Sequence, residues 1–319
     1  MDANLQFWKS EGKTFPQRFY HWVEILDPLL LLKSRKEIES SRALLPTNEP
    51  DITESLQNKK IKAAWKLSLA SVNPATGDTI LAAFRPPAFL PLTAPLAFGV
   101  LLPHKGGKQA FFWQCLFHTY TGAFSLAHGN HTQNTKEFLP KEMLLSMGAI
   151  LYCASMGAFP HFIMTRYQVQ SPSMQVLLKK IIPGPLLAIM CAFNVLVIRG
   201  TELESGIEIM DSKGCVVGVS QNAGEKAVKE TALSRAVMVG ATACIPDIVL
   251  HCLKRTKFLV RNPFVWGPLR SIMMVSILGL MIPVSFSWIP PLGTIQRSLI
   301  EPEIISSTEE TEFFYNRGL

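Results

Sequence analysis

Residues 181–198 read IIPGPLLAIMCAFNVLVI, a run without a single Asp, Glu, Lys or Arg. An α-helix needs about 20 mostly apolar residues to cross the ~30 Å hydrocarbon core of a bilayer. A helix in the core of a soluble protein is usually shorter and apolar on one face only. The stretch therefore predicts a helix that spans a membrane.

Four more segments on either side of this stretch are also apolar on all faces and nearly free of charge. Asp, Glu, Lys and Arg make up only 17% of the chain, against roughly 25% in an average soluble domain. We therefore expect an all-α integral membrane protein with about five transmembrane helices. The predicted spans are residues 86–104, 143–163, 181–198, 236–253 and 271–290.

Residues 109–127 do not fit this pattern cleanly. Aromatic side chains such as Phe111 and Trp113 alternate there with polar ones such as Gln114 and His118. The mixture is typical of an amphipathic helix at the membrane interface or against the bundle, and a sixth span is the alternative.

The remaining segments are polar. Residues 1–85 predict a helical N-terminal region, with helices near residues 36–45 and 57–72. Residues 199–235 predict a polar insert, in which a small β-hairpin is followed by a helix that runs into the fourth span. Residues 291–319 carry several glutamates and predict an acidic tail.

Composition and motifs exclude several classes of function. The net charge is +7, but no Lys/Arg-rich run is interleaved with aromatics, so a lipid bilayer and not nucleic acid is the expected partner. The six cysteines show no CxxC or Cys/His spacing, so no metal site is expected. No nucleotide-binding, nucleophile-elbow or zinc-protease motif occurs, and we expect neither an enzyme nor a cofactor.

Polar side chains inside the spans are the candidate functional residues, because in hydrocarbon they are costly and tend to face the bundle interior. Asn194 and Arg199 lie at the end of the third span, and Asp247 follows Pro246 in the fourth, one helical turn before His251. Together they predict a polar path for a solute. Alternatively, Asp247 and His251 reach the headgroups and Asn194 bonds a neighbouring helix.

Short motifs along the whole chain resemble, in order, those of the sideroflexins, most similarly the sideroflexin-4 branch. Each motif is weak alone, but their ordered sum is specific. The motifs include the turn Asn73-Pro74-Ala75-Thr76 before the first span, Asn194 with Arg199-Gly200-Thr201-Glu202, Ser234-Arg235, Ile245-Pro246 and the final Phe314-Tyr315-Asn316-Arg317-Gly318-Leu319.

The resemblance implies a multi-pass protein of the mitochondrial inner membrane, in a class of amino-acid transporters whose best-understood members carry serine. The signature turn departs from the family, because typical members have His-Pro-Asp-Thr where this chain has Asn73 and Ala75. The missing imidazole and carboxylate put serine transport itself in doubt, although a small amino acid remains the expected ligand. The alternative implied function is a non-transporting factor for respiratory complex I assembly and iron–sulfur or haem homeostasis, with assembly proteins as partners.

Overall fold

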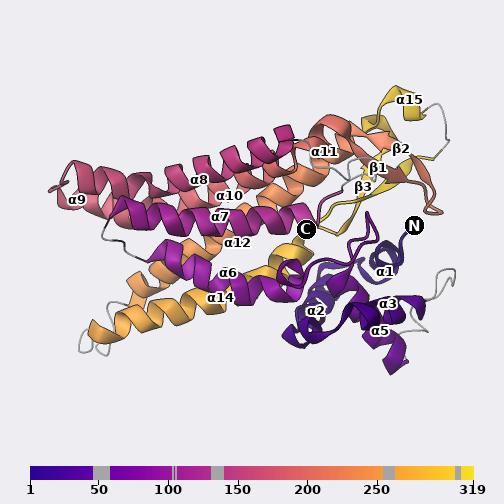
Figure 1. The fold of residues 1–319 in the computed structure, drawn as a ribbon, viewed down its shortest axis with the longest axis horizontal. Helices are drawn as coiled ribbons and strands as arrows, with labels where there is room; N and C mark the ends of the chain where they lie inside the picture. Colours follow the sequence, from indigo (N-terminus) through magenta and orange to yellow (C-terminus); the bar gives the residue numbers. More distant parts are fainter. Residues whose placement is uncertain (46–57, 103, 105, 131–139, 254–262, 306–309) are drawn as a thin grey trace.

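The computed structural model describes residues 1–45, 58–102, 104, 106–130, 140–253, 263–305 and 310–319, and the chain is mostly helical (Figure 1). Within these residues, four helices are long and apolar enough to span a bilayer. This confirms a helical, multi-pass membrane protein. Three of the four are α8 (Pro140–Arg166), α12 (Gln221–Leu253) and α14 (Trp266–Trp288). The fourth is a composite helix over Pro172–Ile198, made of α9 (Pro172–Val176), a π-helical turn (Leu177–Ile181) and α10 (Pro183–Ile198).

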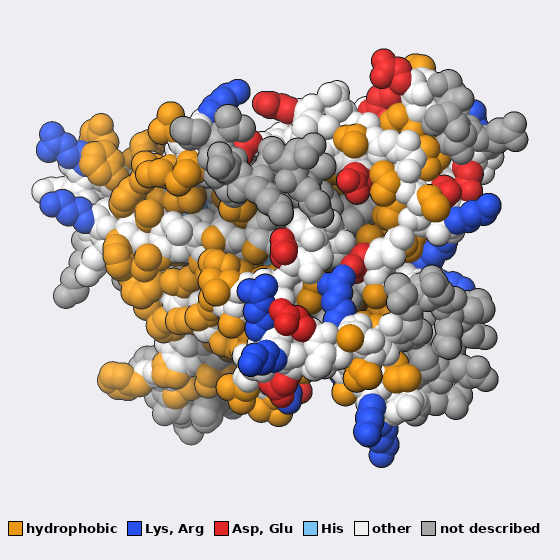
Figure 2. All heavy atoms as spheres, turned by 45° about the vertical axis from the view of Figure 1, so that its right-hand side comes forward, with side chains coloured by type: hydrophobic (Ala, Val, Ile, Leu, Met, Phe, Trp, Pro, Cys, Tyr) orange, Lys and Arg blue, Asp and Glu red, His pale blue; other side chains and the backbone are white. Residues whose placement is uncertain are grey.

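The apolar surface of these helices is what requires a membrane. Only 33 to 39% of the most apolar stretch of each span is buried inside the protein. Figure 2 shows apolar side chains gathered over the helical bundle at the left of the view, whereas the acidic side chains lie at its centre and right, and Lys and Arg occur at both ends. A surface this apolar is stable only against lipid. Exposed side chains of the bundle include Leu144, Leu151, Phe159, Ile189, Ile248 and Leu280.

The first predicted span is a shorter helix, α6 (Pro86–Leu101). Its 16 residues cover about 24 Å at 1.5 Å per residue, less than the hydrocarbon thickness. The ambiguous segment forms α7 (Gly107–Ala127), which lies lengthwise against α8 (Figure 1). The two helices approach closely, because a Cβ on Gly157 of α8 would lie 2.4 Å from the Gln114 side chain.

The N-terminal region packs as a small helical domain on one end of the bundle (Figure 1). Its core is aromatic, with Phe7, Trp22 and Trp65 almost fully buried. Trp22 meets Phe286 of α14 at 5.1 Å between ring centroids, so domain and bundle share one core. Its helices are α1 (Ala3–Glu11), α2 (Phe15–Ile25), α3 (Arg35–Ala43) and α5 (Lys59–Ser71), with 3₁₀ turns at Pro28–Leu32 and Ala82–Phe84; α3 and α5 are the two predicted from sequence.

The predicted hairpin exists, as β1 (Ile207–Met210) and β2 (Val216–Ser220), but it is half of a larger sheet. The other half comes from the segment expected to be an acidic tail, as β3 (Leu292–Gln296) and β4 (Glu312–Asn316). The strand order is β2-β1-β4-β3, and every neighbouring pair is antiparallel. Between them lie a 3₁₀ turn (Arg297–Leu299) and α15 (Pro302–Ile305), and α11 (Gly200–Ser205) precedes β1.

The tail is therefore not simply a solvated acidic segment. In β4 the side chains of Phe313 and Tyr315 are fully buried. Opposite Tyr315 stands Gly293, where a Cβ would lie 2.3 Å from the tyrosine ring. The glycine thus makes room for the ring, and the strand closes the core of the sheet.

Phe313→Ala should destabilise the protein by about 3–5 kcal/mol, because it empties a fully buried ring site. Val216→Ala, on the exposed face of the same sheet, should change stability by less than about 0.5 kcal/mol. The thermal midpoint of the purified protein in detergent measures both. Equal midpoints for the two variants would show that β4 is not packed as described.

Candidate functional site

The four predicted path residues fall into two pairs, one towards the place where α10 runs into α11 and the other near the end of α12, and Figure 1 shows these two places at opposite ends of the bundle. Asn194 and Arg199 are each only 1% exposed, where α10 meets α11 and the end of the chain. Asp247 is half-buried and His251 exposed near the end of α12. The structure therefore does not bring the four together as one continuous path.

Arg199 is the centre of a buried polar junction. Its Nε and Nη2 each lie 2.6 Å from a carboxylate oxygen of Glu202. The same guanidinium donates from Nη1 to Thr231 Oγ1 on α12 at 3.1 Å and from Nη2 to the Arg317 carbonyl oxygen at 2.8 Å. Burial raises the pKa of Glu202, but the charge and hydrogen bonds of Arg199 hold it below its usual value. The pair is therefore ionised and fully bonded.

Glu202 also forms hydrogen bonds with the segment that follows α7. Asn130 donates to Glu202 Oε2 at 3.0 Å and to the Asn316 carbonyl oxygen at 2.8 Å. Gly318 has a φ of +73°, and a Cβ there would lie 2.5 Å from the His128 carbonyl oxygen. Only glycine suits such a backbone at such a distance, so the end of the chain is built into this junction.

The family signature turn packs beside the same junction. Asn73 is buried, and its Nδ2 donates to the carbonyl oxygens of Ala127 and Gly129 at 3.1 Å each. Its Oδ1 accepts from the Ala75 N–H at 2.8 Å, which forms the turn itself. Asn73 thus satisfies carbonyl groups that the end of α7 leaves open, while Ala75 is exposed.

Several polar side chains between the helices carry a buried atom that has no hydrogen-bond partner within the described part of the chain. His118 is fully buried in α7, with both ring nitrogens unpartnered. Asn194 donates from Nδ2 to the His118 carbonyl oxygen at 3.0 Å, which leaves its Oδ1 free. Unpartnered atoms also occur on Gln114, His128 and Arg235.

At the opposite end, Asp247 binds Arg270 of α14 and not His251. The guanidinium Nε and Nη2 lie 2.7 and 3.1 Å from the two carboxylate oxygens. Arg270 also donates from Nη1 to the Leu101 carbonyl oxygen at 3.1 Å. The ion pair therefore ties α12, α14 and the end of α6 together.

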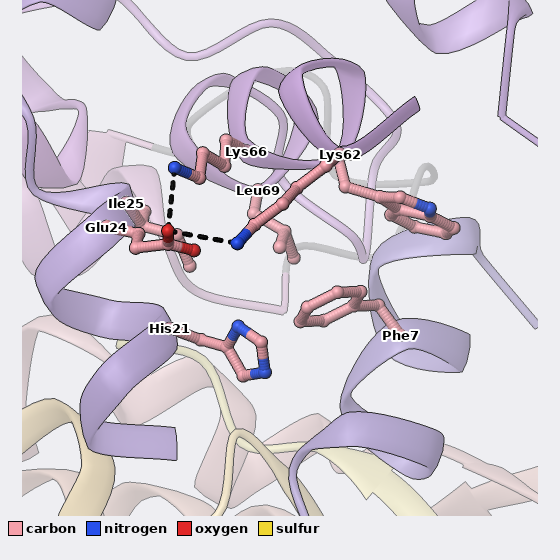
Figure 3. Close-up of a pocket in the computed structure, with 8 residues that line it drawn as sticks. Phe7, His21, Glu24, Ile25, Lys62, Lys66 and Leu69 are labelled. Carbon is pink, nitrogen blue, oxygen red and sulfur yellow. Dashed lines mark ion pairs between the residues drawn. The ribbon is translucent and has the colours of Figure 1, made fainter. Parts of the chain in front are cut away.

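A separate pocket of about 90 Å³ lies in the N-terminal domain, between α1, α2 and α5 (Figure 3). Glu24 faces Lys66 at 2.9 Å and Lys62 at 3.1 Å across it, and His21 and Phe7 line its other side (Figure 3). Burial raises the pKa of Glu24, but hydrogen bonds from both lysines bring it below its usual value. Burial lowers the pKa of His21, which favours its neutral form.

Sequence reasoning missed Arg270, Arg235 and His128 as site residues. Arg235 stands directly before the predicted fourth span, and a charge at that place usually marks a helix end. The described residues contain no group of three His, Cys, Asp or Glu side chains that could hold a metal ion.

Comparisons with known proteins cover the whole chain. A family model described as "Sideroflexins" matches residues 2–319. Sideroflexin-4 of Danio rerio is 45% identical and that of Bos taurus 42%, each with 100% of both chains covered. Sideroflexin-5 of Homo sapiens is 29% identical, over 98% of this chain and 91% of its own. No solved structure matches the chain.

Asn73→Ala should destabilise the protein by about 1–3 kcal/mol, because two carbonyl groups near the end of α7 lose their donors. Thr76→Ala removes one exposed acceptor of the same turn and should cost less than about 0.5 kcal/mol. Thermal midpoints in detergent report both changes. An unchanged thermal midpoint in Asn73→Ala would contradict the role of Asn73 as donor to these carbonyl groups.

Glu24→Gln should lower the stability of the N-terminal domain by about 1 kcal/mol, because two lysines lose their counter-charge. Glu39→Gln breaks an exposed pair with Arg35 and should cost less than about 0.5 kcal/mol. The pKa of Glu24 is lower in the folded state, so its contribution exists above the usual 4.5 and disappears as pH falls through the folded value. Limited proteolysis at pH 7 and at pH 4 compares Glu24→Gln with the unmodified protein, and the difference between them should be smaller at the lower pH.

Proposed function

The chain belongs to the sideroflexin family, and from this premise we propose that it carries a small amino acid or a related solute across the mitochondrial inner membrane. The observation that supports this is the set of buried, unpartnered polar atoms between the helices, above all Asn194 Oδ1 and the ring nitrogens of His118. Each such atom costs about 1–3 kcal/mol when nothing bonds to it. In a bundle surrounded by lipid, water or a solute must supply the missing partner.

The two ion pairs at the ends of the bundle are what we expect of a carrier. The Arg199–Glu202 junction closes one end, and the Asp247–Arg270 pair joins helices at the other. The free imidazole of His118 lies on α7, and the free amide oxygen of Asn194 lies on α10, five residues before Arg199. A carrier must open each end in turn around a fixed site. We propose that the half-exposed Asp247–Arg270 pair opens more easily than the fully buried junction.

The signature turn gives no support to serine as the substrate. Both Nδ2 hydrogen bonds of Asn73 go to backbone carbonyls, and Ala75 offers no charge. The turn therefore supports α7 in this chain and has no group to bind an ammonium or move a proton.

The alternative function is a non-transporting factor for assembly of respiratory complex I. One observation favours it: Leu29 and Leu32, outside the spanning helices, are 68% and 81% exposed. Exposed apolar side chains on a polar domain mark contact surfaces for partners or membranes. Under this reading the bundle anchors the domain and carries nothing.

Reconstitution into proteoliposomes separates the two functions. The purified protein should take up at least one solute from a panel of small amino acids, and Asn194→Leu should reduce that uptake at least tenfold. Phe193→Leu, one position away on the lipid-facing side, should leave uptake unchanged. If no amino acid enters above empty liposomes while loss of the protein depletes complex I on native gels, the assembly function replaces the carrier.

A further inference from the structure

Among the described residues, Arg235 is a buried charge with two unpartnered nitrogen atoms. It lies within α12 with 5% of its surface exposed, and neither Nη1 nor Nη2 has a hydrogen-bond partner in the described chain. An isolated charge at such a depth is strongly unfavourable unless something pairs with it. Its burial therefore requires an explanation that the bundle alone does not supply.

Three phenylalanine rings surround the guanidinium. Its central carbon lies 5.2 Å from the ring centroid of Phe89, 5.2 Å from that of Phe124 and 4.7 Å from that of Phe286, on α6, α7 and α14. Cation–π contacts of this kind stabilise the charge and fix the position of the group. They do not satisfy its N–H donors, which lie in the plane of the guanidinium and require acceptor atoms.

The surroundings of Arg235 add positive charge and no carboxylate. The charged or titratable groups near enough to interact with it are Arg199, Arg317, His128, Tyr120 and Cys191. Arg199 is already neutralised by Glu202. No ion pair of Arg235 with an acidic side chain occurs among the described residues, so its charge has no counter-ion there and its two Nη groups have no acceptor.

We propose that Arg235 binds the carboxylate of the carried solute. This rests on the proposed carrier function and narrows its substrates to small monocarboxylates, amino acids among them. A planar carboxylate matches the two free ends of a guanidinium in a bidentate pair. A phosphate carries more charge and more acceptor atoms than one arginine in a phenylalanine cage can satisfy, so a carboxylate is the better fit.

Thermal unfolding of the purified protein in detergent tests the proposal without relying on uptake. Alanine and propionate, which share a carboxylate, should raise the midpoint in a concentration-dependent manner. Ethylamine and alaninamide, which lack it, should not. Equal shifts by the amines and the acids would overturn the assignment to Arg235, and this comparison needs no variant.

Two substitutions then locate the effect. Arg235→Lys keeps the charge but loses the two-pronged geometry, and should weaken the apparent affinity for alanine at least tenfold; Arg235→Gln should abolish the shift. Arg18→Lys is the matched control, since Arg18 is equally buried but donates to the Ser287 and Gly12 carbonyl oxygens. Affinity unchanged in Arg235→Lys would show that the carboxylate binds elsewhere.

The outcomes also separate this inference from the carrier function. Uptake of an amine-only solute, with no thermal response to carboxylates, would refute the role of Arg235 and leave the carrier intact. Absence of both uptake and any thermal response would refute the two together.

Discussion

The buried Arg199–Glu202 ion pair is the interaction on which the rest of the structure depends. Two charges at this depth are costly to remove from water, and they persist only where every donor and acceptor is used. The pair meets this condition through hydrogen bonds with Thr231 of α12, Asn130 after α7 and the backbone of Arg317. One ion pair thereby fixes the corner between α10 and α11 against three other parts of the chain. The signature turn joins through Asn73, which supports the end of α7.

The surrounding lipid is a second constraint, because it cannot satisfy the buried polar side chains of the bundle. Water can satisfy a stray polar group near the surface of a soluble protein, but not inside a bilayer. His118, Asn194 and Arg235 are therefore more informative here than they would be in a soluble core. The Phe cage around Arg235 shows how the bundle tolerates a cation while leaving its hydrogen-bond donors free.

The spanning helices could be predicted from sequence because hydrophobic length is a local property. The same holds for the hairpin and for α3 and α5, where turn residues and apolar spacing act over short distances. The pairing of Asp247 with Arg270 could not be predicted, because it depends on how α12 packs on α14. The helix that runs from the polar insert into the fourth span was predicted and is α12, but the burial of Arg235 within it could not be, because it depends on how α6, α7 and α14 pack around it. In the tail, many glutamates masked the alternation that places Phe313 and Tyr315 in a sheet.

The placement of β4 has a consequence for biogenesis. The strand β4, and the Arg317 carbonyl that completes the bonding of Arg199, follow the last described spanning helix in the sequence, so they are synthesised after it. Before these residues are synthesised, the spanning helices can enter the membrane, but the Arg199–Glu202 ion pair remains accessible to water. Insertion and final closure are thus separate events. A truncated chain would be expected to reach the bilayer and still be recognised by proteases as unfinished.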